Sequence, residues 1–338
     1  MRMRRDEEAP LLRDAASALG GVEPLVLAVS GGLDSMVLMH VAASARASRK
    51  KTLTVATFDH RSGSHSAAAA RFVQRHATKL GLRSISGQAA TVMHREHEWR
   101  EARWNFLRAA AAKGGARVVT AHTLDDQIET VFMRILRDAG PRGLAGLFAE
   151  SEVLRPLLTV RRTELAEYAR VKQVRHVDDP SNESRVHLRN RVRHELLPAI
   201  SRVRPSFQRD LLSIARAASQ WRAEMTGTVE TIGTIGGDGA LRVARADLAG
   251  YDAESLRTIW PAIAAKAGVV MDRRGTHRLA EFTMKGHTGG SIQLSGGIEV
   301  RMSRDQMLVQ RWDARRVEMI RNSRLGPATA TAWARAET

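Results

Sequence analysis

The 338-residue chain contains no cysteine. It therefore cannot form disulfides, cysteine-based zinc sites or iron–sulfur clusters, and it cannot carry sulfur as a thiol or persulfide. Aromatic residues are also few, at 4% of the sequence, which argues against a sheet that binds single-stranded RNA by stacking bases on exposed rings. The lack of cysteine excludes functions that depend on a cysteine nucleophile or on a sulfur relay carried by this chain.

Long apolar runs are missing as well. The sequence has no uninterrupted apolar run of roughly 18 residues, the length that crosses a bilayer, so we expect no transmembrane helix and no membrane partner. The first residues, MRMRRDEEAPLLRD, carry positive charges as a signal peptide does, but acidic residues follow where the apolar core should be. We therefore expect a cytoplasmic protein.

Negative charge is scarce relative to positive charge. The chain has 36 aspartate and glutamate residues against 53 lysine and arginine residues, a net charge of +17. So large an excess favours a polyanionic partner, because phosphates are attracted by such fields at long range. A general basic bias of the proteome would produce the same excess, so the charge alone does not identify a partner.

Residues 1 to about 150 alternate short apolar runs with helical patterns, and we predict that the domain they form extends over residues 1–186. The runs PLVLAVS, TLTVATFD, LRSISG and ARVVTAH have the composition of buried strands, and each precedes a segment with helical periodicity. This alternation predicts an α/β fold with a Rossmann-like parallel sheet. In such sheets, ligands bind beyond the carboxyl ends of the strands, where the strand-to-helix loops gather.

The remaining chain divides by pattern into three parts. Residues 187–228 have the pattern of a helical connecting region interrupted by two prolines, and residues 229–313 that of a small α+β domain. Residues 314–338 are small and polar, which is typical of a loose tail. We therefore predict one large α/β domain, a helical connection, a smaller domain and a tail.

A Ser-Gly-Gly sequence occurs twice, and only the first copy stands between a predicted strand and a predicted helix. The glycines allow the backbone to turn sharply and approach a ligand, while the helix N-terminus attracts an anion. Asp34 can hold a magnesium ion that bridges phosphates, although Asp34-Ser35 also fits an ordinary helix N-cap. The predicted phosphate loop consists of Ser30, Gly31, Gly32, Leu33, Asp34 and Ser35.

The second copy, at residues 295–297, precedes the alternating sequence IEVRM. Two glycines between two strands predict a hairpin turn, and we assign no ligand to it. Neither copy is followed by the Gly-Lys-Ser/Thr of a Walker A loop. The phosphate loop at residues 30–35 is therefore of another kind.

The sequence SGGLDS after a hydrophobic strand resembles the pyrophosphate loop of the PP-loop ATPase superfamily. Further blocks occur in order over about residues 24–200: FDH, REARWNFL, TAHTLDDQIETVFMRILRDAGPRGLAGL, LRPLL and VDDPSNESRVHLRNRVRHELLP. Together these blocks resemble the tRNA(Ile)-lysidine synthase family. Six blocks in the order of the family are far more specific than a single glycine-rich loop.

The resemblance implies a two-step reaction. ATP adenylates the C2 carbonyl oxygen of the wobble cytidine in the CAU anticodon of tRNA(Ile), and the ε-amine of free lysine then displaces AMP. The product, lysidine, changes codon reading from AUG to AUA. ATP and Mg²⁺ are the implied cofactors, and tRNA(Ile) and lysine the implied partners. We expect no DNA partner, and the sequence leaves the oligomeric state open, a homodimer included.

The block AHTLDDQIET is suited to binding and deprotonating an amine. Asp126 and Glu129 are three residues apart and share a helix face, and His122 ends the preceding strand. The alternative is an acidic first helical turn favoured by the helix dipole, with His122 as a hydrogen-bonded loop residue. The resemblance assigns catalysis to Asp126, Glu129, His122 and Arg103, and adds Asp59 and His60 to the ATP site.

The block HLRNRVRHELLP contains a basic cluster at a predicted helix start. Arginine binds phosphate in bidentate fashion, so tRNA or ATP phosphate is a reasonable ligand, although a solvated helix face is the ordinary alternative. The predicted phosphate-binding residues are Arg189, Asn190, Arg191 and Arg193. We give Asp178, Asp179 and Asn182 a structural role, and expect residues 229–313 to recognise tRNA shape and backbone through their arginines.

Four other functions compete with this interpretation. A PP-loop tRNA-modifying enzyme could use another nucleophile, and a tRNA thiolase is disfavoured because the chain has no cysteine. An amidotransferase-type synthetase would need a glutaminase domain or partner. A non-catalytic nucleotide- or RNA-binding module could dispense with Asp126 and Glu129.

Overall fold

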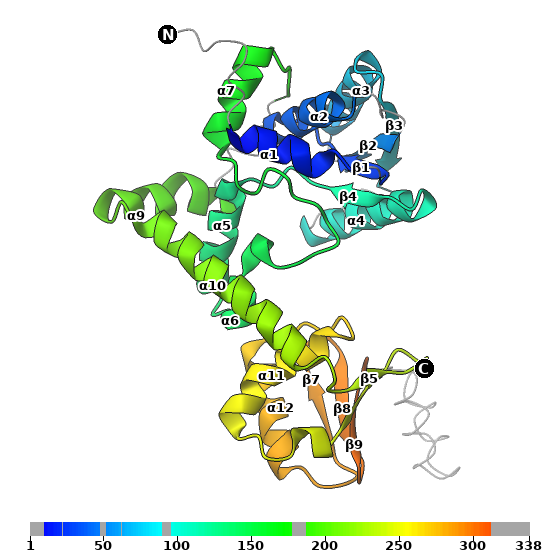
Figure 1. The fold of residues 1–338 in the computed structure, drawn as a ribbon, viewed down its shortest axis with the longest axis vertical. Coiled ribbons are helices and arrows are strands. Elements are labelled where there is room, and N and C mark those ends of the chain that lie inside the picture. Colours follow the sequence, from blue (N-terminus) through cyan, green and yellow to red (C-terminus); the bar gives the residue numbers. More distant parts are fainter. Residues whose placement is uncertain are drawn as a thin grey trace, which may run out of the picture. The chain divides into compact units, whose positions relative to one another are not determined.

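The computed structural model describes residues 10–311 except 22, 48–51, 62, 90–95 and 178–186 (Figure 1). Asp178, Asp179, Asn182 and the predicted tail lie outside the described residues. The described residues form two compact units. The first unit lies within Met1–Arg137 and Gly143–Ser219, and the second within Asp138–Arg142 and Gln220–Thr338.

The first unit contains a four-stranded parallel sheet in the order β3-β2-β1-β4. Its strands are β1 (Leu25–Ala28), β2 (Leu53–Asp59), β3 (Arg83–Gln88) and β4 (Arg117–Val119). A parallel bridge between Val119 and Leu154 continues the sheet beyond β4. The predicted Rossmann-like parallel sheet is therefore confirmed, and all its strands end at one edge.

Helices cover both faces of this sheet because side chains alternate along each strand. Leu25 and Leu27 pack with α1 (Pro10–Leu19), α2 (Leu33–Ala45), α3 (Ser64–Lys79) and α7 (Arg162–Lys172). Val26, between them, packs on the opposite face with α4 (Glu96–Lys113). The central strand β1 (LVLA) is apolar in every position because both of its faces are covered, whereas the edge strand β3 (RSISGQ) is mostly polar and partly exposed.

A helical layer next to the sheet is built around α5 (Leu124–Ile135). The apolar face of α5 packs against α10 (Phe207–Thr228) and the turns before it. These turns are α8 (Leu188–Arg191), the π-helical η4 (Val192–Leu196) and α9 (Leu197–Val203). The predicted interruption at Pro198 is wrong, because the chain passes from η4 into α9 without leaving helical geometry, whereas Pro205 lies in the turn between α9 and α10. The short α6 (Pro141–Leu144) and η2 (Gly146–Phe148) follow α5.

The second unit packs two helices on a five-stranded antiparallel sheet of order β5-β6-β9-β8-β7. Trp260 is fully buried in its core, and its indole N–H donates to Thr283 Oγ1 at 2.9 Å. The strands are β5 (Thr234–Ile235), β6 (Leu241–Ala244), β7 (Ser291–Leu294), β8 (Ile298–Met302) and β9 (Gln306–Arg311). The two helices are α11 (Ala253–Ala265) and α12 (Arg273–Lys285), and the short 3-10 turn η5 (Ala246–Leu248) precedes them.

The second Ser-Gly-Gly forms the turn between β7 and β8, as predicted. Leu294 pairs with Ile298 across the turn, and Gly296 and Gly297 have φ of +78° and +70°. None of the helices in the described part of the chain combines the length and apolarity of a membrane span.

Candidate active site

The first Ser-Gly-Gly connects β1 to α2 at the carboxyl edge of the sheet. The Ser35 hydroxyl accepts the N–H groups of Ser30 and Gly31, both at 3.2 Å, and donates to the carbonyl of Gly32 at 2.9 Å. Gly31 has φ of +99°, a conformation that favours glycine. The N-cap of α2 is Gly32, so the alternative that Asp34-Ser35 forms the N-cap is wrong.

This loop has the properties of an anion site. The N–H groups of the first helical turn have no acceptor within the helix, and the helix dipole gives this end a partial positive charge. The turn begins at Leu33, directly after Gly32. A phosphate at this end would accept hydrogen bonds from N–H groups that water would otherwise have to satisfy.

Asp34 lies in the same turn, and its two carboxylate oxygens differ. Oδ2 pairs with Arg162, at 3.1 Å from Nε and 3.0 Å from Nη2. Oδ1 is buried and has no hydrogen-bond partner among the described residues. Burial raises the pKa of Asp34, against the charge of Arg162.

A free carboxylate oxygen beside a phosphate loop fits Mg²⁺, which commonly takes one or two carboxylates together with phosphate oxygens and water. Within the described residues, no group of three or more histidine, aspartate or glutamate side chains could hold a metal alone. The residues present therefore fit an ion that arrives with a nucleotide.

Asp59 and His60 follow β2, the strand next to β1. Asp59 is buried, and it accepts hydrogen bonds from Ser66 Oγ and the backbone N–H of Arg61. Burial acts to raise the pKa of Asp59, but these hydrogen bonds outweigh it and the pKa is lowered. Asp59 thus holds its own loop, while His60 lies edge-on to Phe58 with ring centroids 5.1 Å apart.

The block AHTLDDQIET places Asp126 in the first turn of α5, where it forms a capping box with Thr123. One oxygen, Oδ2, accepts the backbone N–H and the hydroxyl of Thr123, at 2.8 and 3.0 Å. The other, Oδ1, accepts Arg189 Nη2 at 3.0 Å. Burial acts to raise the pKa of Asp126, but Arg189 and Thr123 outweigh it and the net shift is downward.

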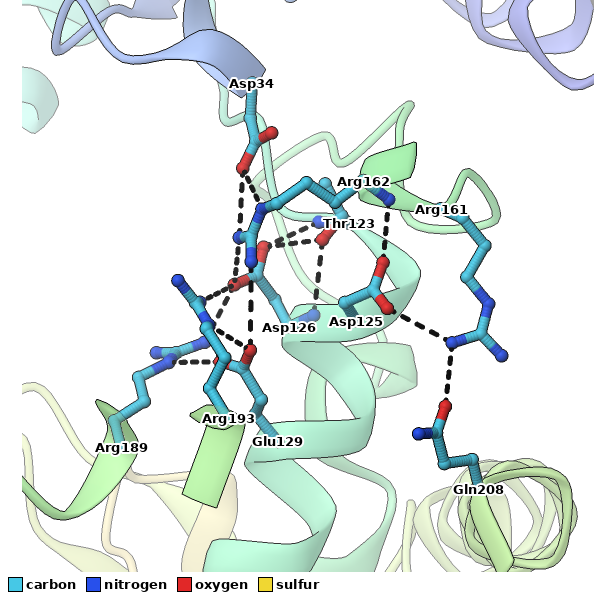
Figure 2. Close-up of polar contacts among 10 residues, drawn as sticks. All are labelled: Asp34, Thr123, Asp125, Asp126, Glu129, Arg161, Arg162, Arg189, Arg193 and Gln208. Carbon is cyan, nitrogen blue, oxygen red and sulfur yellow. Dashed lines mark hydrogen bonds and ion pairs between the residues drawn. The ribbon is translucent and has the colours of Figure 1, made fainter. Parts of the chain in front are cut away.

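Glu129 lies one turn further along α5, and its side chain is 3% exposed. It accepts Arg193 Nε at 2.6 Å and Arg189 Nε at 2.8 Å. Figure 2 shows Arg162 reaching between Asp34 above and the carboxylates of α5 below. We call these six side chains the carboxylate–arginine cluster: Asp34, Asp126, Glu129, Arg162, Arg189 and Arg193.

The predicted basic cluster divides between two environments. Arg189 and Arg193, four residues apart, both reach Glu129. Arg191, between them, is 53% exposed at its side chain and lies 3.8 Å from Glu195. Asn190 is half-buried.

Two arginines, one in the cluster and one beside it, were not predicted from the sequence. Arg162 begins α7, and its backbone N–H donates to Asp125 at 2.7 Å. Arg161 binds Asp125 at 3.1 Å and Gln208 at 3.0 Å (Figure 2). These contacts join α5, α7 and α10, and so fix Arg162 over the carboxylates. A run of two arginines gave no local signal of this arrangement.

His122 and Arg103 lie beside this cluster. His122 Nδ1 is 2.8 Å from the hydroxyl of Thr120. Burial, together with the charges of Arg155, Arg189 and Arg103, lowers the pKa of His122 to about 4, although Asp126 opposes this. The imidazole is therefore neutral at physiological pH. Arg103, on α4, has a buried Nε without a hydrogen-bond partner among the described residues.

The architecture and the loop are those of a PP-loop protein. A family model described as a PP-loop domain matches residues 12–200. A U34-tRNA thiolase NcsA from Methanococcus maripaludis, solved with its [4Fe-4S] cluster, is similar with a TM-score of 0.50. The match covers 62% of this chain and 76% of the thiolase at 14% identity, so it shows the fold alone.

Relatives found by sequence identify the family more narrowly than the fold does. A tRNA(Ile)-lysidine synthase of Salinispora arenicola is 33% identical over 305 residues, 86% of this chain and 91% of its own. That of Bradyrhizobium diazoefficiens is 36% identical over 270 residues, 72% of this chain and 70% of its own. The chain belongs to the tRNA(Ile)-lysidine synthase family. The chain spans only about half the length of several other curated relatives, for example 47% of a relative from Thermotoga.

Proposed function

We propose that this protein ligates lysine to C2 of the wobble cytidine in the CAU anticodon of tRNA(Ile), with ATP converted to AMP and diphosphate. The product would be lysidine, which changes codon reading from AUG to AUA. Family membership supports this proposal. The main structural support for the proposal is that Arg162 contacts both Asp34 of the phosphate loop and Asp126 of α5. This contact supports a centre in which the proposed phosphate site adjoins the proposed lysine site.

In the first step, the cytidine O2 would attack the α-phosphorus of ATP. An O–P bond forms, the bond to the bridging oxygen breaks, and diphosphate leaves. The loop of Ser30–Ser35 would bind the departing diphosphate through its N–H groups and hydroxyls. Asp34 would hold a Mg²⁺ ion that neutralises phosphate charge.

In the second step, the ε-amine of lysine would attack C2 of the adenylated cytidine. A C–N bond forms, the C–O bond to AMP breaks, and the amine loses its extra proton. Asp126 and Glu129 would bind the ammonium in competition with the arginines that hold them. Because His122 has a pKa of about 4, it carries no charge at neutral pH that would repel the ammonium. A base with so low a pKa accepts a proton poorly at neutral pH, so the proton that the amine loses would pass to Asp126, Glu129 or water.

We further propose residues 1–186 as the catalytic domain, 187–228 as its helical connection and 229–313 as a tRNA-recognition domain. The described residues of the parallel sheet, the phosphate loop and the carboxylates of α5 all lie within the first range. The nearest alternative is another adenylating PP-loop enzyme that acts on tRNA with a different nucleophile.

Half-reactions separate the two steps. With tRNA(Ile) transcript and ATP, Asp34→Asn is expected to lower diphosphate release at least about tenfold, because a phosphate-side ligand is lost. Glu129→Gln is expected to raise the KM for lysine by at least about tenfold and to leave diphosphate release largely intact. Glu167→Gln, on the exposed surface of α7, is the control. Loss of both half-reactions in Glu129→Gln would contradict this division of labour.

A further inference from the structure

Two arginines beside the candidate site have no carboxylate to neutralise them. Arg103 and Arg155 are half-buried, and neither forms an ion pair with any residue that the structure describes. The Nε atom of each is buried without a hydrogen-bond partner in that part of the chain. The arginines of the carboxylate–arginine cluster, in contrast, all contact acidic side chains. A buried cation without a counter-charge costs free energy, which a ligand of opposite charge would recover.

The backbone places Arg155 at the carboxyl edge of the sheet. Leu154, its neighbour, bridges Val119 at the end of β4 and accepts the N–H of Thr120 at 3.0 Å. Since β1 occupies the other side of β4, Arg155 lies one strand position beyond β4, away from the phosphate loop. Among the described residues, its guanidinium is held by Ser151 Oγ alone, at 3.3 Å.

Arg103 approaches the same place from α4. The residue after it, Trp104, packs with Val118 of β4 and with Val153, two residues before Arg155. The exposed Arg100 lies one turn before Arg103 on α4. Burial lowers the pKa of both Arg103 and Arg155, and the positive charge of Arg100 lowers both further. Arg103 and Arg155 in turn lower the pKa of His122. Both arginines are therefore next in sequence to residues that pack at or beside the end of β4, the strand that precedes His122.

We propose that Arg155, together with Arg103, forms a phosphate subsite for the RNA backbone next to the reacting nucleotide. This inference rests on the proposed function for the identity of the RNA. A nucleotide that reaches the carboxyl edge of the sheet brings its flanking phosphodiesters with it, and the planar guanidinium binds phosphate in bidentate fashion. The phosphates of ATP have their own binding groups in the loop of Ser30–Ser35, on the far side of β4 from Arg155.

Equilibrium binding tests the subsite without relying on catalysis. The probes are a CAU anticodon stem-loop RNA and, separately, ATP, each titrated against the full chain. Arg155→Gln and Arg103→Gln are expected to weaken RNA binding about tenfold each. The slope of log K against log salt should fall by about 0.7 for each phosphate that the variant no longer binds. The affinity for ATP should not change.

Arg117→Gln is the matched control, because Arg117 begins β4 at the opposite edge and pairs with Glu23 on the surface. It should bind RNA as the wild type does. A loss of ATP affinity with unchanged RNA affinity would assign the subsite to the nucleotide and overturn the proposal, as would unchanged binding of both. Failure of lysine transfer alone would refute only the proposed function, because RNA binding is measured separately.

Thermal unfolding separates a ligand-binding role from a structural one. Removing an unpartnered buried charge should leave Tm unchanged or raise it, whereas removing a structural arginine lowers it. Arg155→Lys should retain part of the RNA affinity lost in Arg155→Gln. A fall of several degrees in the Tm of Arg155→Gln, with no recovery of RNA binding in Arg155→Lys, would overturn the proposal.

Discussion

Arg162 is the residue on which the candidate site depends most. Its guanidinium is 3.0 Å from Asp34 and 3.5 Å from Asp126, and it lies 3.9 Å from Glu129. Without a cation at this position, Asp34 and Asp126 would repel each other in a half-buried environment. A guanidinium therefore holds the loop and α5 together where the proposed substrates would also bind.

His122 should make stability depend on pH. Its pKa is about 4 in the folded state and 6.5 ordinarily, so the unfolded chain binds more protons between these values. Unfolding free energy should fall as pH drops from 7 to 4, with up to roughly 3 kcal/mol of the loss due to His122. Urea titrations of the wild type and His122→Asn measure the difference. Parallel pH profiles for the two would show that His122 titrates normally.

At the scale of elements, the side chain of Gln127 joins α5 to the η2 turn. Gln127 is fully buried, donates to Ala145 O at 3.0 Å and accepts the N–H of Leu147 at 2.6 Å. Gly146 lies between these partners with φ of +60°. A β-carbon there would be 2.5 Å from Gln127 Oε1. The glycine is required for close approach as well as for backbone conformation.

Gly146→Ala should therefore destabilise the fold more than the replacement of a glycine at which the new side chain causes only backbone strain. Gly115 is the matched control, because its φ is +55° and a β-carbon at this residue would have no neighbouring atom within 4 Å. We expect Gly115→Ala to cost about 1 kcal/mol and Gly146→Ala about 2–4 kcal/mol, since the latter also disrupts two buried hydrogen bonds. Urea-induced unfolding measures both. Equal losses would mean that Gln127 moves aside freely.

The elements themselves were largely predictable from the sequence. Apolar strands followed by helical patterns indicated the parallel sheet, and the two glycines with Asp34 indicated the loop at its edge. The sequence could not predict which carboxylates and arginines of the carboxylate–arginine cluster pair, because the partners are distant in sequence. Asp126 and Arg189, for example, are 63 residues apart. Arg162 carries no local pattern that distinguishes it from surface arginines, and Arg155, although it lies in the block LRPLL, was given no role from the sequence. Only the topology, which ends β4 beside Leu154 and starts α7 over α5, gives them their positions.

At the scale of the whole molecule, the positive charge is unevenly distributed. Residues 10–219 contain 33 lysine and arginine residues against 20 acidic ones, a net charge of +13. Residues 220–311 contain 12 against 10, a net charge of +2. Several arginines of the second unit are paired, as Arg242 is with Asp238. Long-range attraction of a polyanion therefore comes mainly from the first unit, and recognition by residues 229–313 would depend on shape and hydrogen bonds.

Incorporation of labelled lysine into a tRNA(Ile) transcript with a CAU anticodon tests the central claim most directly. The reaction should require ATP, approach one lysine per tRNA, and place the label in the wobble nucleoside when the RNA is digested. Asp126→Asn should abolish it, whereas Glu167→Gln should not. Formation of AMP that depends on tRNA, without lysine in the RNA, would contradict the account and indicate a different nucleophile.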